Sequence, residues 1–215
     1  MHPRIDMKTQ PPTILCPLRM EASKVRPMAA RHGWDVITTG IGATAVESAI
    51  TSAPGTGPLV LAGVAGALRA EFHPGGAYLV REVVTSTGLL YSPLLDNGIR
   101  VTGADKIVAT PEDKAALAEQ TGAHIVDMES HAFAVLAEST GRDWMIVRGI
   151  SDGVEHHLPP GCDQWFTSSG SIRPVRAALD LARRPGDLVH LMAFAKRTAT
   201  AMRAVAALLD ETFGK

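Results

Sequence analysis

The sequence predicts a single α/β domain, a three-layer αβα sandwich with a central mixed sheet. The first observation is that short strand-like runs alternate with helical runs along the 215 residues. The second is that several strand-like runs are apolar on both faces, as in strands covered by helices on each side. The third is that 46% of the residues are hydrophobic but only 5% are aromatic, which favours a core of small aliphatic side chains.

The first half of the chain is predicted to place its strands before glycine-rich or charged segments. A polar stretch at 1–12 is expected to be a flexible leader, and the domain is expected to span 13–215. Gly33 is expected to close the first helix, as glycine commonly does just after a helix. Strands are predicted within 13–18, 34–42, 58–68 and 75–86, and helices within 19–33 and 43–53.

The second half of the chain continues this alternation. Residues 88–110 contain turn signals with short β-like runs between them. A helix is expected at 110–122, where Thr110 is a suitable N-cap and Pro111 a suitable first residue. A strand around Val126, a helix, a strand around 145–147 and two further helical runs at 172–184 and 187–213 complete the prediction.

The charge balance argues against nucleic acid as a partner. Lys plus Arg is 21 and Asp plus Glu is 22, a net charge of −1, so the chain has no basic field to neutralise phosphates. Cys16 and Cys162 do not make a disulfide framework in so long a chain and are expected to be free thiols. The N-terminal stretch lacks the apolar region of a secretory signal, and no apolar run approaches the roughly 20 residues of a membrane span. These features predict a cytoplasmic protein.

Unusual residues gather where the predicted strands end. Ligands of open α/β sheets bind beyond the carboxyl ends of the strands, so these segments are expected to meet at one rim. Each has an ordinary structural explanation, because glycine pairs form tight turns and an acid is favoured in the first turn of a helix. Their joint occurrence indicates a site. The segments are Arg19 with Glu21, Gly40-Ile41-Gly42, Gly63-Val64-Ala65-Gly66, Met128-Glu129, and Arg148 with Ser151 and Asp152.

Motifs for metals, nucleotides and serine nucleophiles do not occur in a suitable context. His156 and His157 are adjacent and point in different directions, and neither an HExxH motif nor a cysteine pair accompanies them. The sequence has no GxxxxGK[ST] or GxGxxG segment, and no GxSxG segment that leads into a helix. The sequence therefore predicts neither a metal site nor a bound cofactor.

Five segments together resemble the nucleoside phosphorylase and nucleosidase family, which includes purine nucleoside phosphorylases and methylthioadenosine/S-adenosylhomocysteine nucleosidases. They are "MEASKV", "GIGATAV", "LAGVAGAL", "VDMESHA" and "VRGISD", in this order between Ile14 and Asp152. The pairing of MES with R-x-ISD at this separation is the most specific part. "VATPEDKAALAEQTGAHIVDMESHA", the later L-P-P and the tail "LARRPGDLVHLMAFAKRTATAMRAV" are similar to hopanoid-associated phosphorylases, which are implicated in removing adenine from adenosylhopane.

The resemblance implies an enzyme that cleaves the N-ribosidic bond of a purine nucleoside, with adenine as the expected base. The departing purine must be protonated or hydrogen-bonded at N7, which a carboxylic acid in a semi-dry pocket can do. Asp152 matches the family's acid, steadied by Ser151. Burial would have to favour the protonated form of this carboxyl for it to donate near neutral pH.

The remaining roles are also implied by the resemblance. Glu129 matches the carboxylate that binds the ribose hydroxyls, with Met128 packed on the sugar, and it also suits the positive charge of an oxocarbenium-like transition state. Arg148 resembles the family arginine near the nucleophile, and Glu21 aligns with the glutamate that activates water in the nucleosidases. The substrate pocket is expected to include Val64, Ala65 and Gly66.

Two departures bear on the choice between phosphate and water as the nucleophile. Arg19 stands two residues before Glu21, where the nucleosidases are acidic, and with the amides of Gly40-Ile41-Gly42 it could hold a phosphate anion. Val64 replaces a serine of the nucleosidases. Glu21 favours water instead, because a carboxylate repels phosphate. The sequence leans toward phosphorolysis, with inorganic phosphate as co-substrate, and leaves hydrolysis of methylthioadenosine or S-adenosylhomocysteine open.

A nucleoside-binding protein without turnover is the alternative from another class, and Val64 gives it some support. The 5′ side of the substrate is expected to lie against Phe72, Tyr91 or Phe133, with room for a large apolar group. Family members are dimers, trimers or hexamers, so the resemblance also implies a homo-oligomer. The expected partner is a small-molecule purine nucleoside.

Overall fold

The computed structural model describes residues 10–159, 162–165, 167, 169–171, 173 and 187–214. Residues 1–9 of the expected leader and nearly all of the helix expected at 172–184 lie outside the described residues, as does the side chain of Cys162. Cys16 is a free, buried thiol, and burial raises its pKa. None of the described helices is long and apolar enough to cross a membrane.

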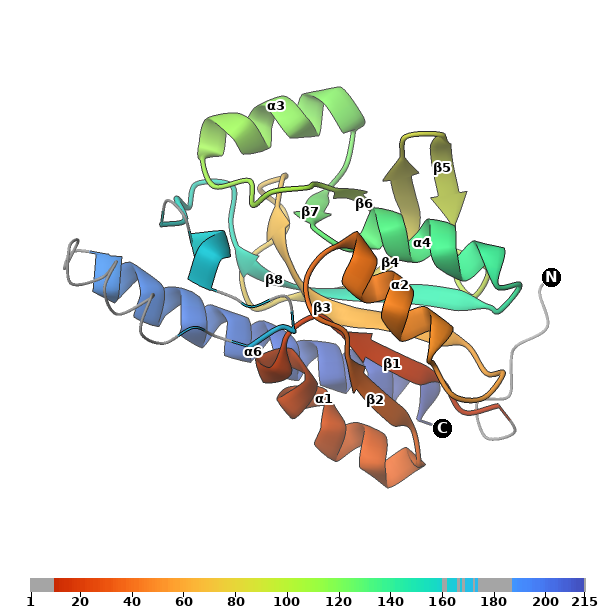
Figure 1. Ribbon diagram of the computed structural model, residues 1–215. Helices are drawn as coiled ribbons and strands as arrows, with labels where there is room; N and C mark the ends of the chain where they lie inside the picture. The colour runs from red at the N-terminus through yellow and green to blue at the C-terminus, as the bar shows by residue number, and fades with distance from the viewer. Residues whose placement is uncertain are drawn as a thin grey trace.

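The elements occur in the order that the sequence predicts, and Figure 1 shows a sheet with helices on both sides. The strands are β1 (Thr13–Cys16), β2 (Asp35–Thr38), β3 (Leu59–Ala67), β4 (Ala77–Thr85), β5 (Gly88–Tyr91), β6 (Ile99–Gly103), β7 (Ile125–Asp127) and β8 (Trp144–Asp152). The helices are α1 (Arg19–His32), α2 (Ala43–Thr51), α3 (Pro111–Thr121), α4 (Ser130–Ser139), the 3₁₀ helix η1 (Cys162–Trp165) and α6 (Asp187–Phe213). The predicted α/β fold with a central mixed sheet is confirmed.

The eight described strands form one mixed sheet that closes partly on itself. β3 pairs in parallel with β1 and β8, and β1 pairs in parallel with β2 at the sheet edge. β8 also pairs with β4, β4 with β6, β6 with β7, and β7 returns to β3. β3, β8, β4, β6 and β7 therefore make a closed ring, from which β1 with β2 and β5 extend.

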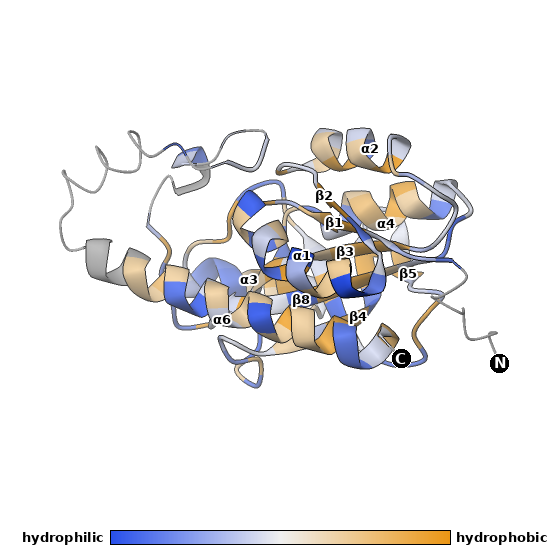
Figure 2. Ribbon diagram, turned by 90° about the horizontal axis from the view of Figure 1, so that it is seen from below, coloured by the Kyte–Doolittle hydropathy of each residue, from blue (hydrophilic) through white to orange (hydrophobic). Residues whose placement is uncertain are grey.

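Two large hydrophobic clusters lie on the two faces of the sheet. On one face, α2 and α4 pack together through residues that include Val46, Ile50 and Phe133. On the other face, α1 packs against α6, with Val25 and Met202 among the buried residues. Figure 1 shows α2 and α4 on the side opposite α1 and α6. In Figure 2 apolar and polar residues alternate in bands along α6, as expected of a helix with one buried face.

Two helix ends match the sequence signals. α1 ends before Gly33, which has a φ of 70° and so adopts the left-handed conformation that favours glycine. α3 begins after Thr110, whose hydroxyl accepts a hydrogen bond of 3.1 Å from the Asp113 amide, and Pro111 occupies the first turn. At the start of α1 the Glu21 side chain accepts a hydrogen bond from the Leu18 amide and another from the Val64 amide of β3, so a buried acid lies against the sheet.

The glycine segment 63–66 lies within the strand predicted at 58–68, and the segment from Arg148 to Asp152, which was expected to follow the strand around 145–147, is also part of a strand. β3 continues to Ala67 and β8 to Asp152, and the two pair in parallel from Leu59 with Trp144 to Gly66 with Asp152, with a register shift at Ala65. The physical reason is the ring, which gives β3 a second partner, β7, over its last residues. Pairing on both sides keeps a glycine-rich segment extended.

Candidate active site

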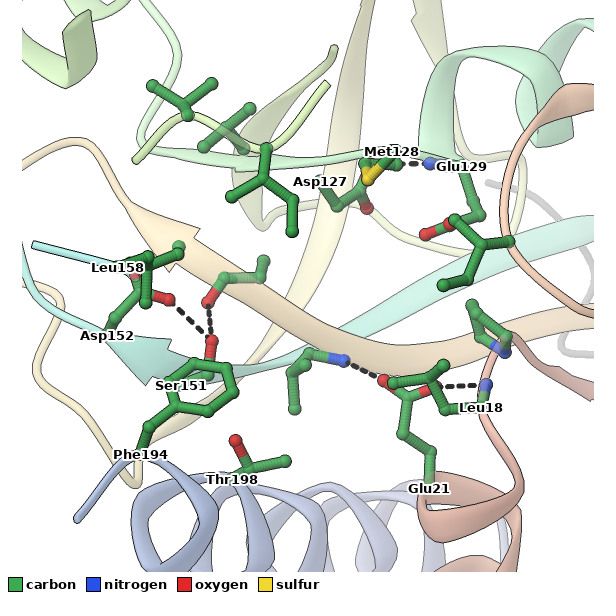
Figure 3. Close-up of a pocket in the computed structure, with 18 of the residues that line it drawn as sticks. Leu18, Glu21, Asp127, Met128, Glu129, Ser151, Asp152, Leu158, Phe194 and Thr198 are labelled. Atoms are coloured by element: carbon green, nitrogen blue, oxygen red, sulfur yellow. Dashed lines mark hydrogen bonds between the residues drawn. The ribbon is translucent and has the colours of Figure 1, made fainter. Parts of the chain in front are cut away.

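A pocket opens where α1, β3, β7, β8 and α6 meet, and most of the predicted site residues line it. Figure 3 shows Asp152 and Ser151 at one end, Glu21 at the other, and Met128 and Glu129 on a third side. The polar side chains that line it are Glu21, Lys106, Asp127, Glu129, Ser151, Asp152 and Thr198. The apolar residues include Met20, Ile41, Val64, Ala65, Ile107, Val108, Met128, Leu158 and Phe194, and Gly66 also lines it.

Arg19, which was predicted to belong to a phosphate site, does not line this pocket. The side chain is exposed and lies in a separate surface hollow with Arg26 and Thr38. The reason is helical geometry, because Arg19 and Glu21 both belong to α1, and residues two apart on a helix point to nearly opposite sides. With Glu21 turned inward, Arg19 must turn outward.

The amides of the glycine loop are also largely engaged. The Gly40 amide donates to the Pro17 carbonyl at 3.1 Å, and the Gly42 amide donates to Glu129 Oε1 at 3.3 Å. Both glycines have positive φ values, 95° and 89°, which turn the chain sharply between β2 and α2. Of the predicted triplet, Ile41 lines the pocket. The loop therefore holds a carboxylate of the site, and its arrangement does not match the predicted anion cradle.

Glu21 is buried at the pocket wall with 2% of its surface exposed. Its two carboxylate oxygens accept hydrogen bonds from the Leu18 amide at 2.7 Å and the Val64 amide at 2.8 Å. Burial raises the pKa of Glu21 to about 7, although Arg148 and the two amides act in the opposite direction. A carboxylate with a pKa near neutrality is suited to act as a general base. Val64 lacks the hydroxyl found in nucleosidases but contributes its backbone N–H.

Arg148 lies beneath the pocket, fully buried, among three carboxylates. Its Nε is 2.6 Å from Asp127 Oδ2, and its Nη2 is 3.5 Å from Glu129 Oε2. Both distances are those of ion pairs. Burial alone would lower the pKa of Arg148, but Asp127, Glu129 and Glu21 outweigh it and raise the pKa. Burial raises the pKa of Glu129, with the charges of Asp127 and Glu21 adding to the effect.

Sequence reasoning missed Asp127, which organises this part of the site. It accepts hydrogen bonds from the amides of Glu129 at 3.2 Å and Ser130 at 2.9 Å, and from the Ser130 hydroxyl. These bonds fix the turn from β7 into α4, so that Glu129 projects toward the pocket. The signal was available, because Asp127 ends an apolar strand two residues before Glu129.

Two glycines of β3 make room for the charged side chains. A Cβ at Gly63 would overlap Arg148 Nη1 and would stand 2.9 Å from Glu21 Oε1. A Cβ at Gly66 would stand 3.0 Å from Asp152 Oδ2. The glycines noted in the sequence therefore allow side chains from α1 and β8 to approach the backbone of β3.

Asp152 is held by partners on both oxygens. The Ser151 hydroxyl donates to Oδ1 at 2.7 Å and also lies 3.2 Å from the Ala65 carbonyl oxygen. The ammonium of Lys114, from α3, donates to Oδ2 at 2.6 Å, and the two side chains are only 1% and 4% exposed. Sequence reasoning missed Lys114, because a lysine in a polar helix gives no signal of burial. The expected acid therefore lies beside a buried cation.

The C-terminal helix adds two pocket residues that the sequence did not indicate. Phe194 and Thr198 are one turn apart on α6, and both line the pocket. The Thr198 side chain is 2% exposed, and its hydroxyl has no hydrogen-bond partner among the described residues. The aromatic residues expected on the 5′ side are elsewhere, since Phe72 and Phe133 are core residues and Tyr91 is 49% exposed on β5. Among the described residues, Phe194 is the aromatic residue that lines the pocket.

The sequence matches a family model. The model of the phosphorylase superfamily covers residues 95–212, more than half of the chain. The chain belongs to the phosphorylase superfamily. The predicted family is confirmed, as is the predicted class of enzyme, a nucleoside phosphorylase or nucleosidase. No curated protein sequence matches this superfamily member.

Solved structures share the fold of this superfamily member at low sequence identity. The futalosine hydrolase of Helicobacter pylori superposes with a TM-score of 0.67 at 14% identity, covering 94% of this chain and 96% of that one. A 5′-methylthioadenosine/S-adenosylhomocysteine nucleosidase from Neisseria meningitidis, in complex with methylthio-immucillin-A, gives 0.64 at 14%, covering 95% and 99%. The nucleosidase from H. pylori gives 0.63 at 16%, covering 94% and 97%.

Proposed function

We propose that this superfamily member is a nucleosidase that hydrolyses the N-ribosidic bond of a purine nucleoside. The observation that carries the proposal is the buried Glu21, which faces the pocket, accepts two backbone hydrogen bonds and has a pKa of about 7. The exposed position of Arg19 and the engaged glycine amides supply no phosphate site of the kind that the sequence suggested. The geometry therefore favours hydrolysis over the phosphorolysis toward which the sequence leans.

Glu21 acts in this proposal as the general base for water. The backbone amides of Leu18 and Val64 orient its carboxylate, and a pKa near neutrality leaves a large ionised fraction that can still accept a proton. The proton of the attacking water moves to Glu21 as the oxygen bonds to C1′ of the ribose. Phosphate would have to enter beside this carboxylate, which disfavours an anion.

The ribose is proposed to lie between Glu21 and Asp152, against Met128 and Glu129. Glu129 would accept hydrogen bonds from ribose hydroxyls, and its orientation is fixed by the Gly42 amide and by the turn at Asp127. Breaking the bond to the base leaves positive charge on the sugar ring, which nearby carboxylates stabilise. Arg148 acts from beneath, because it keeps these buried acids together without reaching into the pocket.

The base is proposed to bind at the end of the pocket that holds Asp152 and Ser151. Asp152 would hydrogen-bond to N7 and deliver a proton there as the bond to C1′ breaks. Ser151 orients the carboxyl through its hydrogen bond to Oδ1. Purines carry N7 and pyrimidines do not, so this geometry supports a purine nucleoside, and adenine stays the expected base.

The 5′ group is proposed to be apolar. Much of the pocket wall is apolar, with Ile107, Val108, Leu158 and Phe194 among its residues. Such a wall suits the thioether groups of methylthioadenosine or a longer hydrocarbon such as that of adenosylhopane. The link to hopanoids rests on sequence resemblance alone. No cofactor is required in the proposed mechanism, and the expected homo-oligomer stays a prediction.

The test is base release in phosphate-free buffer from adenosine, 5′-methylthioadenosine and adenosines with longer 5′-alkylthio chains, followed by chromatography. We expect adenine release from these substrates. The value of kcat/KM should rise with chain length, by a factor that corresponds to at most about 0.8 kcal/mol of binding free energy per buried CH₂. The rate should fall steeply in Asp152→Asn. Release that requires added phosphate would replace hydrolysis by phosphorolysis. Binding of the nucleoside without release would favour a binding protein that lacks turnover.

A further inference from the structure

The partner of Asp152 is a buried ammonium whose three donors are all used. Lys114 Nζ donates to Asp152 Oδ2 at 2.6 Å, to the Gly153 carbonyl at 2.7 Å and to the His156 carbonyl at 3.2 Å. The lysine comes from the first turn of α3 and is 1% exposed. An ammonium has three N–H donors and no acceptor, so this geometry satisfies it completely.

The same geometry also satisfies the neutral amine. If one proton passes to Asp152, the remaining two N–H groups still meet the carbonyls of Gly153 and His156, and the nitrogen lone pair faces the new O–H of Asp152. Lysine and aspartate can thus exchange one proton without rearrangement of their neighbours.

We propose that Lys114 is a positioning residue that supplies, through Asp152, the proton taken by the leaving base. The inference rests on the proposed function and deepens it, since both oxygens of Asp152 accept hydrogen bonds, from Ser151 and from Lys114, and the carboxylate needs a source for the proton it delivers. Arg148 cannot serve, because its neighbours are Asp127, Glu129 and Glu21. Lys114 is the cation within hydrogen-bond distance of Asp152 among the described residues.

The proton balance of the step closes. As the bond between C1′ and the base nitrogen breaks, its electron pair goes to the base and N7 becomes more basic. Lys114 Nζ passes a proton to Asp152 and becomes a neutral amine, and Asp152 delivers this proton to N7. Water adds to C1′ and gives its proton to Glu21. Glu21 then releases a proton to solvent and Lys114 regains one, so the net reaction is nucleoside plus water to ribose plus base.

The experiment compares two leaving groups in phosphate-free buffer. One substrate is 5′-methylthioadenosine, whose base needs a proton at N7 to depart. The other is its N7-methylated analogue, whose base is already cationic and departs without that proton. Each variant is normalised to the wild-type enzyme on the same substrate. Lys114→Met removes the proton and the charge, and Lys114→Arg keeps the charge but cannot release a proton. The exposed Lys24→Met in α1 is the matched control.

The expected result is a fall of about 10²-fold or more in kcat for both Lys114 variants on 5′-methylthioadenosine, with the N7-methylated substrate changed by only a few-fold and Lys24→Met unchanged. Asp152→Asn should likewise lose kcat on 5′-methylthioadenosine and change by only a few-fold on the N7-methylated substrate. Equal losses on both substrates would give Lys114 a purely structural role and overturn the inference. Wild-type-like kcat in Lys114→Arg would overturn it too, because charge alone would then suffice.

Folding and the proposed function are checked separately. If Lys114→Met does not fold, as judged by its melting temperature and circular dichroism, Lys114→Arg decides the question through the same pair of substrates. If both variants fold poorly, Lys114 is structural and the inference is wrong. Failure of the proposed function has a different signature, because the wild-type enzyme would then release base from neither substrate.

Discussion

Replacing Glu21 by Gln tests the account through stability as well as activity. In the folded protein burial raises the pKa of Glu21 from 4.5 to about 7, so the native state holds this proton more tightly than the unfolded chain. The stability that this group contributes is therefore present below its unfolded pKa and is lost as pH rises through about 7. Gln does not titrate, so the variant lacks this pH dependence.

The magnitude follows from the pKa shift and from the two hydrogen bonds. A rise from 4.5 to about 7 corresponds to about 3 kcal/mol of stability lost between mildly acidic and mildly alkaline pH. Both carboxylate oxygens accept a backbone N–H, and a Gln side chain has only one accepting oxygen. One buried amide therefore loses its acceptor, which costs about 1–3 kcal/mol at every pH. The variant should be less stable than wild type in acid and should match or exceed it in alkali.

The assay is urea denaturation of wild type and Glu21→Gln near pH 5 and near pH 8, with the exposed Glu47→Gln of α2 as control. The difference in unfolding free energy between variant and wild type should shift by about 2–3 kcal/mol between the two pH values, and the control should not shift. In parallel, kcat/KM of the wild type should rise with pH through about 7, and the variant should lose about 10²–10⁴-fold. A pH-independent stability difference, or retained activity, would refute the reasoning.

Three further substitutions probe the rest of the site. Asp127→Asn leaves Arg148 without its nearest carboxylate and should cost about 3–5 kcal/mol in urea denaturation, whereas Asp210→Asn, in an exposed ion pair, should have little effect. Thr198→Val should leave the melting temperature unchanged or raise it, because the Thr198 hydroxyl has no partner among the described residues. If that hydroxyl binds substrate, the variant should raise KM several-fold, since a hydrogen bond worth about 0.5–1.5 kcal/mol is lost. An unchanged KM would exclude that contact. Gly63→Ala should lower the unfolding free energy by about 1–3 kcal/mol, because its Cβ overlaps Arg148, and should reduce kcat; normal stability and kcat would show that the cluster tolerates displacement.

Most of the fold was predictable because its signals are local. The N-cap Thr110 and the terminal Gly33 fix helix ends through their own backbone and side chains, and both were read correctly from the sequence. The continuation of β8 to Asp152 was not predictable in this way, and neither was the reason that β3 stays extended. A glycine-rich run becomes a strand here because it has partners on both sides, and those partners, β7 and β8, come more than fifty residues later.

The residues of the candidate site also divide into those with a local sequence signal and those placed by packing between distant segments. Glu129 and Asp152 could be placed because they follow or end apolar runs and match a family motif. The outward turn of Arg19 could also have been derived, since the helix start was predicted and residues two apart cannot share a helix face. The role of Lys114 could not have been derived from the sequence, because its burial depends on α3 packing beside the end of β8. The proton source proposed for the reaction is therefore visible only in the folded chain.

The most direct test of hydrolysis by Glu21 is the identity of the sugar product. Proton NMR of the sugar formed from 5′-methylthioadenosine, with and without inorganic phosphate, distinguishes free methylthioribose from its 1-phosphate. We expect free methylthioribose at the same rate in both samples, with the reaction abolished in Glu21→Gln. Formation of methylthioribose 1-phosphate, only when phosphate is present, would contradict the assignment of Glu21 as the base that activates water.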